Sequence, residues 1–331
     1  MAISRIKTSS ILQGFPKSRS LLAGNTAFNP VIRGGYFGGT YTGSVYAAII
    51  DKLSFPDETK TTLSATLSTA KFYSGGFSNN SVAGYFGGGQ AASGRNDQVD
   101  KIAFSNDTKS TLGTGMTKAT AGLAGAANSG TAGYFAGGYD DAYVNYFTKF
   151  AFPSDTRSTP GATLSGGVNA LAGAANSGTA AYWGGGFDEN TGRTTRIDKL
   201  AFSADTKSTL GATLVSAVYQ ICGAANSGTA AYMSGGGEAG DTFSSSINKI
   251  AFSNDTRSTL SATLTAGGTL NQHAADSGTA LYIGGGNTTG GTGLTNRIDK
   301  ILFSNDTKST LSATLTTSAI YAAAAANSSG L

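Results

Sequence analysis

The sequence predicts an all-β protein, a six-bladed β-propeller with four antiparallel strands in each blade. The first observation is a stretch of tyrosine, a second large side chain and glycines that occurs six times. Its tyrosines lie 49, 49, 48, 50 and 50 residues apart, and a fixed period of this size is typical of repeat architectures. The second is that each repeat holds four segments of strand length. The third is the count of six, which is the size of a common propeller ring.

The aromatic segment is the second strand of each predicted blade. Its copies begin at Tyr36, Tyr85, Tyr134, Tyr182, Tyr232 and Tyr282. Successive side chains of a strand point to opposite faces, so Tyr182 and Trp183 require cover on both faces of their sheet. A blade packed between two neighbouring blades provides that cover.

The other three segments are bounded by turn residues. In the fourth repeat the first segment ends in the turn Asn176-Ser177-Gly178, a tight hairpin signal. The third segment is Ile197–Phe202, and the fourth is expected at Thr209–Leu214. Ser203-Ala204-Asp205-Thr206 joins them, because Asp and Thr side chains can hydrogen-bond their own backbone in a turn.

The two ends of the repeat region are predicted to pair with each other. The lysine that marks the third strand occurs six times, at Lys52, Lys101, Lys149, Lys199, Lys249 and Lys300. The first strand also occurs six times, but its series is shifted: it starts near 70–80 and ends at 322–330. We therefore expect residues 318–330 to pair beside Tyr36–Gly39 and close the ring, which also removes exposed sheet edges.

Two regions follow from this pattern, a basic arm at residues 1–33 and the propeller at 34–331. The arm carries five basic and no acidic residues, whereas the remainder has 18 basic and 19 acidic residues. Its apolar residues suggest an extension that becomes ordered against a partner. A flexible tail is the alternative interpretation. The candidate anchoring residues are Arg5, Lys7, Phe15, Lys17 and Arg19.

Composition narrows the classes of function. The single Cys222 excludes an internal disulfide framework. No apolar stretch has the length of a signal-peptide core or a membrane span, so we expect neither. Basic residues of the repeats show no clustering strong enough for a phosphate track, so nucleic acid is not an expected partner.

No catalytic site, metal site or cofactor is expected. His273 is the only histidine and Cys222 the only cysteine, which is too few for a His/Cys metal site or the copper site of Kelch-like oxidases. Both residues fall in first strands, where packing or lining of the axial channel is the simpler role. The acids recur with the repeat, which favours turn capping and lysine pairing over catalysis. They are Asp107, Asp155, Asp205, Asp255 and Asp306 before threonine, and Asp51, Asp100, Asp198 and Asp299 before lysine.

The repeats differ most in the loop after the aromatic strand and in the links between blades. In a propeller these two sets share one face, and tyrosine is a common interface anchor that also stacks on sugars. That face is the candidate partner-binding surface; unconstrained drift of the loops is the alternative. The candidate partner-binding residues are Tyr41, Tyr46, Tyr139, Tyr143, Tyr146, Arg193, Arg196, Tyr219 and Arg297.

Two resemblances add to this interpretation. Tyr182-Trp183-Gly184-Gly185 and Ile197–Phe202 resemble the Kelch repeat over residues 34–331. The tryptophan that the family carries in its fourth strand is replaced by Leu112, Leu210, Leu260 and Leu311, so the group would be divergent. The opening Met1–Ser10 and the Gly/Ser/Thr/Ala-rich repeats are similar to virion structural proteins of tailed phages, particularly of cyanobacteria.

These resemblances imply a non-enzymatic virion protein in a tail, fibre or capsid-surface role. The arm would attach to other virion proteins. The protein would be located in the virion, and in the host cytoplasm before assembly. The alternative is a carbohydrate-binding propeller that recognises a host or environmental polysaccharide. A hydrolase or lyase with acids on the variable face is a third, weaker interpretation.

Overall fold

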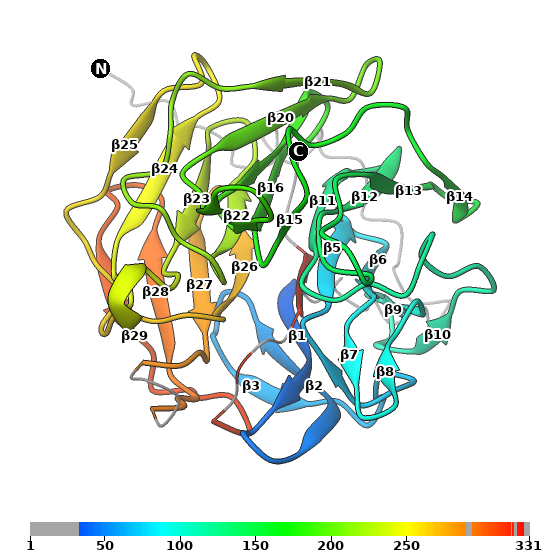
Figure 1. Cartoon of the computed structure of the whole chain (residues 1–331). Helices are drawn as coiled ribbons and strands as arrows, with labels where there is room; N and C mark the ends of the chain where they lie inside the picture. Colours follow the sequence, from blue (N-terminus) through cyan, green and yellow to red (C-terminus); the bar gives the residue numbers. More distant parts are fainter. Residues whose placement is uncertain (1–32, 289–292, 319, 321–322, 328–331) are drawn as a thin grey trace, which may run out of the picture. The chain divides into compact units, whose positions relative to one another are not determined.

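The computed structural model describes residues 33–288, 293–318, 320 and 323–327. The chain divides into two compact units, Met1–Val31 and Ile32–Leu331, and the described residues all belong to the second. This part is all-β (Figure 1), with six four-stranded and two three-stranded sheets. Every pairing is antiparallel. The only helical segment among the described residues is the 3-10 turn η1 (Ala239–Asp241).

The four-stranded sheets follow the repeats. The first contains, in order, β3 (Lys60–Thr62), β2 (Tyr46–Ser54), β1 (Gly34–Tyr41) and β30 (Ala323–Asn327). The second contains β10 (Lys109–Thr111), β9 (Val99–Ala103), β6 (Ala83–Gly87) and β5 (Gly75–Asn79). The third contains β11 (Ala124–Asn128), β12 (Ala132–Ala136), β13 (Phe147–Ala151) and β14 (Thr156–Ser158).

The remaining three have the same order along the chain. The fourth contains β16 (Ala172–Asn176), β17 (Ala180–Gly184), β20 (Ile197–Ala201) and β21 (Thr206–Thr209). The fifth contains β22 (Cys222–Asn226), β23 (Ala230–Ser234), β24 (Ile247–Ala251) and β25 (Arg257–Thr259). The sixth contains β26 (Gln272–Asp276), β27 (Ala280–Gly284), β28 (Ile298–Leu302) and β29 (Lys308–Thr310).

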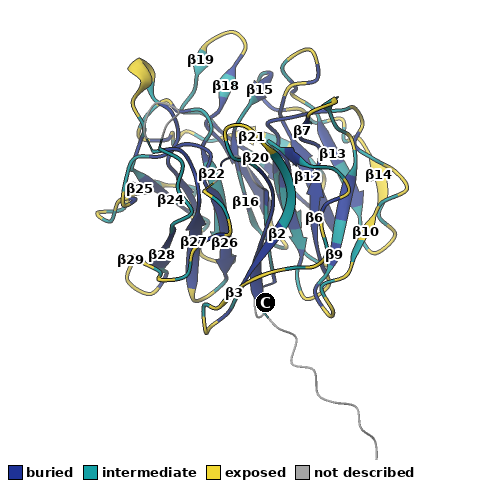
Figure 2. Ribbon diagram, turned by 90° about the horizontal axis from the view of Figure 1, so that it is seen from below, coloured by how far each residue is buried: buried dark blue, intermediate teal, exposed yellow. Residues whose placement is uncertain are grey.

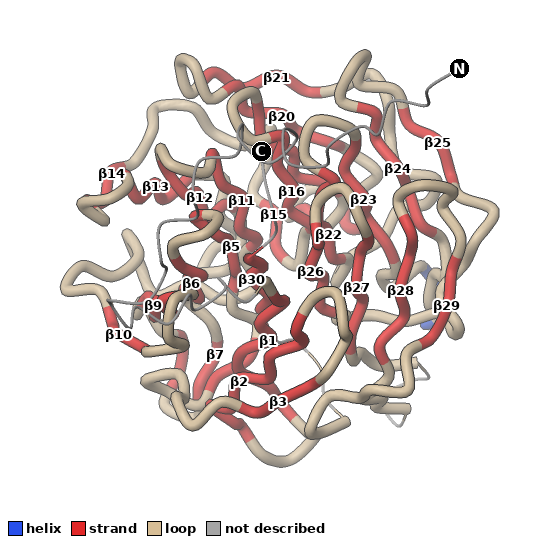
Figure 3. Tube along the Cα trace, turned by 180° about the vertical axis from the view of Figure 1, so that it is seen from behind, coloured by secondary structure: helices blue, strands red, loops and turns tan. Residues whose placement is uncertain are grey.

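The first sheet joins the two ends of the repeat region. β30 pairs antiparallel with β1, with Gly34 opposite Asn327 and Gly38 opposite Ala323. Figure 3 shows β30 beside β1 from behind. The predicted pairing of the chain ends is confirmed for these residues.

The predicted position of the fourth strand was wrong by several residues. β21 is Thr206–Thr209 and not Thr209–Leu214, because the tight turn at Asp205 lets pairing start at once, with Thr206 opposite Ala201. The chain then leaves the sheet, and Leu214 is buried between the fourth and fifth repeats. The leucines at the Kelch tryptophan position therefore lie just beyond the strands.

The aromatic strands have both faces buried, as predicted. Tyr182 packs with Ile197, Met233 and Ile250 in one hydrophobic cluster. Trp183, its neighbour, packs in another with Tyr134 and Phe147. Figure 2 shows the exposed residues gathered in the loops and outer strands.

Parts of the variable segments form small sheets rather than irregular loops. The three-stranded sheets contain β4 (Lys71–Phe72), β7 (Gln90–Ala91) and β8 (Gly94–Arg95), and β15 (Val168–Asn169), β18 (Phe187–Asp188) and β19 (Gly192–Arg193). In each, a loop hairpin pairs with the link that precedes the same repeat. Figure 2 places β7, β15, β18 and β19 at the same end of the unit.

One strand from each four-stranded sheet lines a common cavity. Glycine and alanine dominate this lining, which comes from β5, β11, β16, β22, β26 and β30. Small residues are needed here because the backbones of neighbouring inner strands approach closely. A Cβ on Gly125 would lie 2.2 Å from Gly76 O, and one on Gly76 would lie 2.2 Å from Ala324 O. These contacts link β30, β5 and β11 in sequence around the cavity.

We expect Gly125→Ala to destabilise the protein by about 1–3 kcal/mol, the usual cost of overpacking. The new methyl group would force β11 away from the Gly76 carbonyl. Gly211→Ala is the matched control, because nothing lies within 4 Å of a Cβ there and its φ is not positive. Chemical denaturation of both variants measures the difference, and equal stabilities would contradict the close approach.

Candidate functional site

The repeated lysines of the first five repeats bond to the repeat that follows their own, and the lysine of the sixth repeat, Lys300, bonds to the first repeat. Lys149 Nζ lies 2.7 Å from Asp205 Oδ2, and Tyr134 OH donates to Asp205 Oδ1 at 2.7 Å. The same ammonium lies 5.2 Å from the centre of the Tyr134 ring. The other lysine–carboxylate pairs of this kind are Lys52–Asp107, Lys101–Asp155, Lys199–Asp255, Lys249–Asp306 and Lys300–Glu58.

The carboxylate comes from a turn that holds it in place. Asp205 has a φ of 50°, a left-handed conformation that Asp tolerates better than most residues. Burial, then the hydrogen bond to Asp205, raises the pKa of Tyr134 to about 12. Burial lowers the pKa of Lys149, but its hydrogen bonds to Asp205 and Tyr134 outweigh burial and raise it overall. The predicted lysine pairing is confirmed, and its partner lies in the next repeat.

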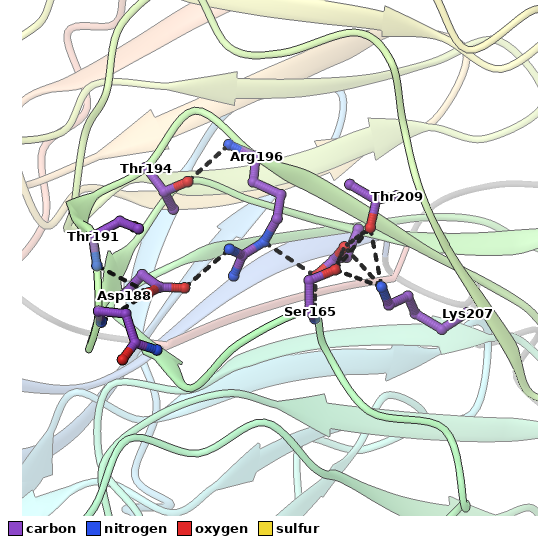
Figure 4. A network of polar contacts seen from close by, with 9 residues as sticks. Ser165, Asp188, Thr191, Thr194, Arg196, Lys207 and Thr209 are labelled. Atoms are coloured by element: carbon purple, nitrogen blue, oxygen red, sulfur yellow. Dashed lines mark hydrogen bonds and ion pairs between the residues drawn. The ribbon is translucent and has the colours of Figure 1, made fainter.

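The acids before the lysines hold the links between repeats. Asp198 accepts hydrogen bonds from the backbone nitrogen and hydroxyl of Ser165 at 2.9 and 2.8 Å, and from Thr209 at 2.7 Å. Figure 4 shows Ser165 and Thr209 together with Lys207. Asp51, Asp100 and Asp299 make the equivalent contacts with Thr316, Ser68 and Thr265.

The Asn-Ser-Gly turns form a third set of bonds between repeats. Asn128 Oδ1 accepts from the backbone nitrogen of Gly178 at 2.8 Å, and Asn176 Oδ1 accepts from Gly228 at 2.9 Å. The sixth repeat carries Asp276 at this position, and Asp276 pairs with Arg33 at 3.2 Å. The polar residues that recur with the repeat are therefore used to join repeats, and the variable segments remain as the candidate site.

Four aromatic side chains from three repeats form a continuous row. We call Tyr139, Tyr143, Phe187 and Tyr219 the aromatic row. The ring centres are 5.4 Å apart for Tyr139 and Tyr143, 6.0 Å for Tyr143 and Phe187, and 6.2 Å for Phe187 and Tyr219. An arginine covers each end: Arg95 lies 5.2 Å from the Tyr139 ring centre and Arg193 lies 4.8 Å from that of Tyr219.

A second aromatic cluster lies on the first two repeats. Tyr41 stacks on Phe72 at 5.2 Å and tilts against Tyr46 at 5.1 Å. Phe72 also contacts Tyr73, whose hydroxyl accepts a hydrogen bond from Gln220 Nε2 at 2.6 Å. Five of the six predicted tyrosines thus fall into two groups rather than one, and Tyr146 belongs to neither.

Three predicted binding residues are engaged within the protein. Arg196 lies 2.9 Å from Asp188 and 3.5 Å from Asp198 (Figure 4), and Arg297 Nε lies 3.4 Å from Asp299. Tyr146 OH donates to Asp140 at 2.9 Å, and burial raises the pKa of Tyr146 to about 12. These side chains support the loops, and sequence position alone did not separate them from the aromatic row.

His273 and Cys222 line a cavity between the inner strands, at the position predicted for them. Burial lowers the pKa of His273 to about 3, so its imidazole is neutral at physiological pH. Ser234 Oγ lies 3.0 Å from its Nε2. Burial raises the pKa of the Cys222 thiol to about 12, and this thiol hydrogen-bonds to the Asn271 carbonyl. The imidazole and the thiol are therefore both uncharged at physiological pH.

The candidate binding residues predicted from the sequence did not include Phe187, Phe72 or Arg95, although Phe187 and Arg95 lie in the predicted variable loops. Phe187 stands five residues after the repeat tyrosine, the same position as Tyr41 and Tyr139. That alignment was the available signal. The anchoring candidates Arg5, Lys7, Phe15, Lys17 and Arg19 lie outside the described residues.

Among the residues that the structure describes, no group of three or more His, Cys, Asp or Glu could hold a metal ion. No helix in the same part of the chain has the length and apolar character to cross a membrane. Comparison of the chain with protein-family models and with curated protein sequences gives no match.

Proposed function

We propose that the six four-stranded sheets are the blades of a six-bladed, Kelch-like β-propeller whose ends close through β30 and β1. Three observations support this arrangement. β30 comes from the end of the chain and completes the sheet of β1. Lys300 of the sixth repeat pairs with Glu58 of the first. One strand of every sheet lines a common cavity.

The proposed function is that of a non-enzymatic structural and interaction protein on a phage particle. One observation supports the interaction role. The recurring Tyr, Lys and Asp side chains bond to each other between repeats, as in Tyr134–Lys149–Asp205. Such a scaffold holds variable loops rigidly, which is how repeat proteins present binding surfaces. The phage setting rests on the resemblance of residues 1–10 and of the repeats, with the arm at 1–33 as the attachment.

Deletion of residues 1–30 is expected to remove the protein from virions while its repeats still fold. Particles assembled with intact or shortened chain would be purified by density gradient and probed by immunoblot. Thermal unfolding of the isolated shortened chain provides the folding control. A folded, shortened protein that stays on the particles would refute the anchoring role, and absence of the intact protein would refute the virion assignment.

Carbohydrate binding is the second candidate, and the aromatic row favours it. Aromatic side chains present flat apolar surface with little conformational entropy to lose on binding. Tyr139 is 37% exposed, and the row crosses loops of three different repeats. This role is compatible with a virion protein that contacts a cell surface.

A further inference from the structure

The arginines near the aromatic row differ in how far their charge is already neutralised. Arg95 forms an ion pair with Asp141, and Arg196 lies between Asp188 and Asp198. Within the described part of the chain, Arg193 has no ion pair and its Nε has no hydrogen-bond partner. A guanidinium has five N–H donors in a fixed fork that matches a carboxylate. Arg193 therefore supplies an unmatched cation at the Tyr219 end of the row.

Local backbone pairing fixes this end of the row. Phe187 and Arg193 are opposite one another in the β18–β19 hairpin, and directly opposed residues project from the same face. β15 pairs with the other edge of β18, opposite β19. Tyr219 forms a backbone bridge with Gly237, where a Cβ would lie 2.5 Å from the Tyr219 ring. Glycine at 237 thus makes room for the ring, and the surface is organised before a ligand arrives.

We propose that the aromatic row binds a strand of acidic polysaccharide, with the sugar rings along Tyr139, Tyr143, Phe187 and Tyr219 and one sugar carboxylate on Arg193. The inference rests on the glycan-binding candidate and adds the charge class of the ligand and its orientation. Sugar rings offer apolar C–H faces to the aromatic side chains, and a uronate offers two oxygens to the guanidinium.

A single-stranded nucleic acid would also present rings and negative charge, but the surface suits it less. Such a strand carries a charge at every nucleotide and requires a continuous positive groove. On this surface acidic side chains lie near the basic ones: Asp141 is beside Arg95, and Asp188 is in the same hairpin as Arg193. One unmatched cation fits a ligand with sparse carboxylates.

The test measures binding of the full chain to a panel of polysaccharides by isothermal titration calorimetry. The panel contains hyaluronate, which carries a carboxylate on every second sugar, polygalacturonate and alginate, which carry one on every sugar, the carboxyl-reduced neutral counterpart of each, and an oligodeoxythymidine. We expect the sparsely charged hyaluronate to bind at least as tightly as the two denser polymers. Its reduced form should bind at least about tenfold more weakly, which corresponds to the loss of one charge-assisted contact.

Variants locate the site. Arg193→Gln should weaken the acidic polymer about tenfold and leave the reduced form unchanged, whereas Tyr143→Ala should weaken both. Tyr139→Ala, at the more exposed end of the aromatic row, should also weaken both forms, and it is less disruptive to folding than Tyr143→Ala. Arg157→Gln is the matched control, because this arginine lies in the edge strand β14, outside the variable loops, and bonds to the carbonyls of Gly115 and Met116; it should leave binding unchanged. Thermal unfolding confirms that each variant is folded.

The outcomes separate this inference from the candidate function beneath it. If no polysaccharide binds, glycan binding and the inference fail together. Equal binding of acidic and reduced forms overturns the acidic specificity and leaves glycan binding standing. Acidic binding that survives Arg193→Gln, Tyr139→Ala and Tyr143→Ala overturns the location. Binding only to the oligodeoxythymidine overturns the ligand class.

Discussion

A chain that ends at residue 317 is expected to lose its cooperative fold. It would lack β30, whose five residues pair with β1 and whose Ala323 and Ala325 are buried. The backbone of Ala324 that covers Gly76 would also disappear. The loss should be on the order of 5 kcal/mol or more, which is comparable with the whole stability of a typical domain.

Thermal unfolding followed by circular dichroism, together with size-exclusion chromatography, measures this effect. We expect a lower melting temperature and aggregation, because β1 would become an exposed sheet edge. A synthetic peptide of residues 318–331 is the matched control, since added strands can restore an open sheet edge. The peptide should raise the melting temperature of the shortened chain. If the shortened chain without the peptide melts at the same temperature as the intact chain, the pairing of β30 with β1 does not contribute to stability.

Asp205→Ala is expected to cost about 2–3 kcal/mol. The substitution leaves the Lys149 ammonium and the Tyr134 hydroxyl without their shared acceptor, and unpaired polar groups of this kind are costly even when part-exposed. This expected loss of stability is smaller than for a fully buried pair, because the side chains of Lys149 and Asp205 are 23% and 24% exposed. Asp141→Ala is the control: its side chain is 87% exposed, and removal of an exposed pair should cost less than about 1 kcal/mol.

The same contact predicts a pH dependence. The pKa of Tyr134 is raised to about 12 by burial and then by Asp205, whereas an unfolded tyrosine ionises near pH 10. The folded state therefore keeps a proton that the unfolded state releases, and stability is lost as pH rises from about 10 towards 12. In Asp205→Ala the pKa of Tyr134 should fall but stay raised, because burial remains. Urea unfolding and tyrosinate absorbance across this range test both statements, and an unshifted titration would contradict them.

Much of the strand pattern could be predicted from the sequence. The aromatic pair Tyr182-Trp183 required burial on two faces, and the Asn-Ser-Gly turn required a hairpin. Both follow from neighbouring residues alone. The fourth strand was displaced because Leu214 is apolar for a different reason: it packs between repeats rather than extending the sheet.

The candidate site was less accessible to prediction. Tyr143 and Tyr219 were identified as variable tyrosines, but their common row depends on Phe187, which belongs to another loop. Arg193 and Arg196 look alike in the sequence. They differ only because Arg196 reaches Asp188 and Asp198, while Arg193 reaches the Tyr219 ring.

The sequence by itself determined the period, the segment boundaries to within a few residues, and the pairing of the chain ends. These depend on local propensity and on counting. Only the tertiary structure decided the partners across repeats, such as Asp205 for Lys149 and Glu58 for Lys300. Glu58 stands where the other repeats have Asp, yet its carboxylate pairs with Lys300 in the way that Asp205 pairs with Lys149. Hydrogen bonds between residues far apart in the chain depend on where side chains end in three dimensions, which the identity of the residue alone does not fix.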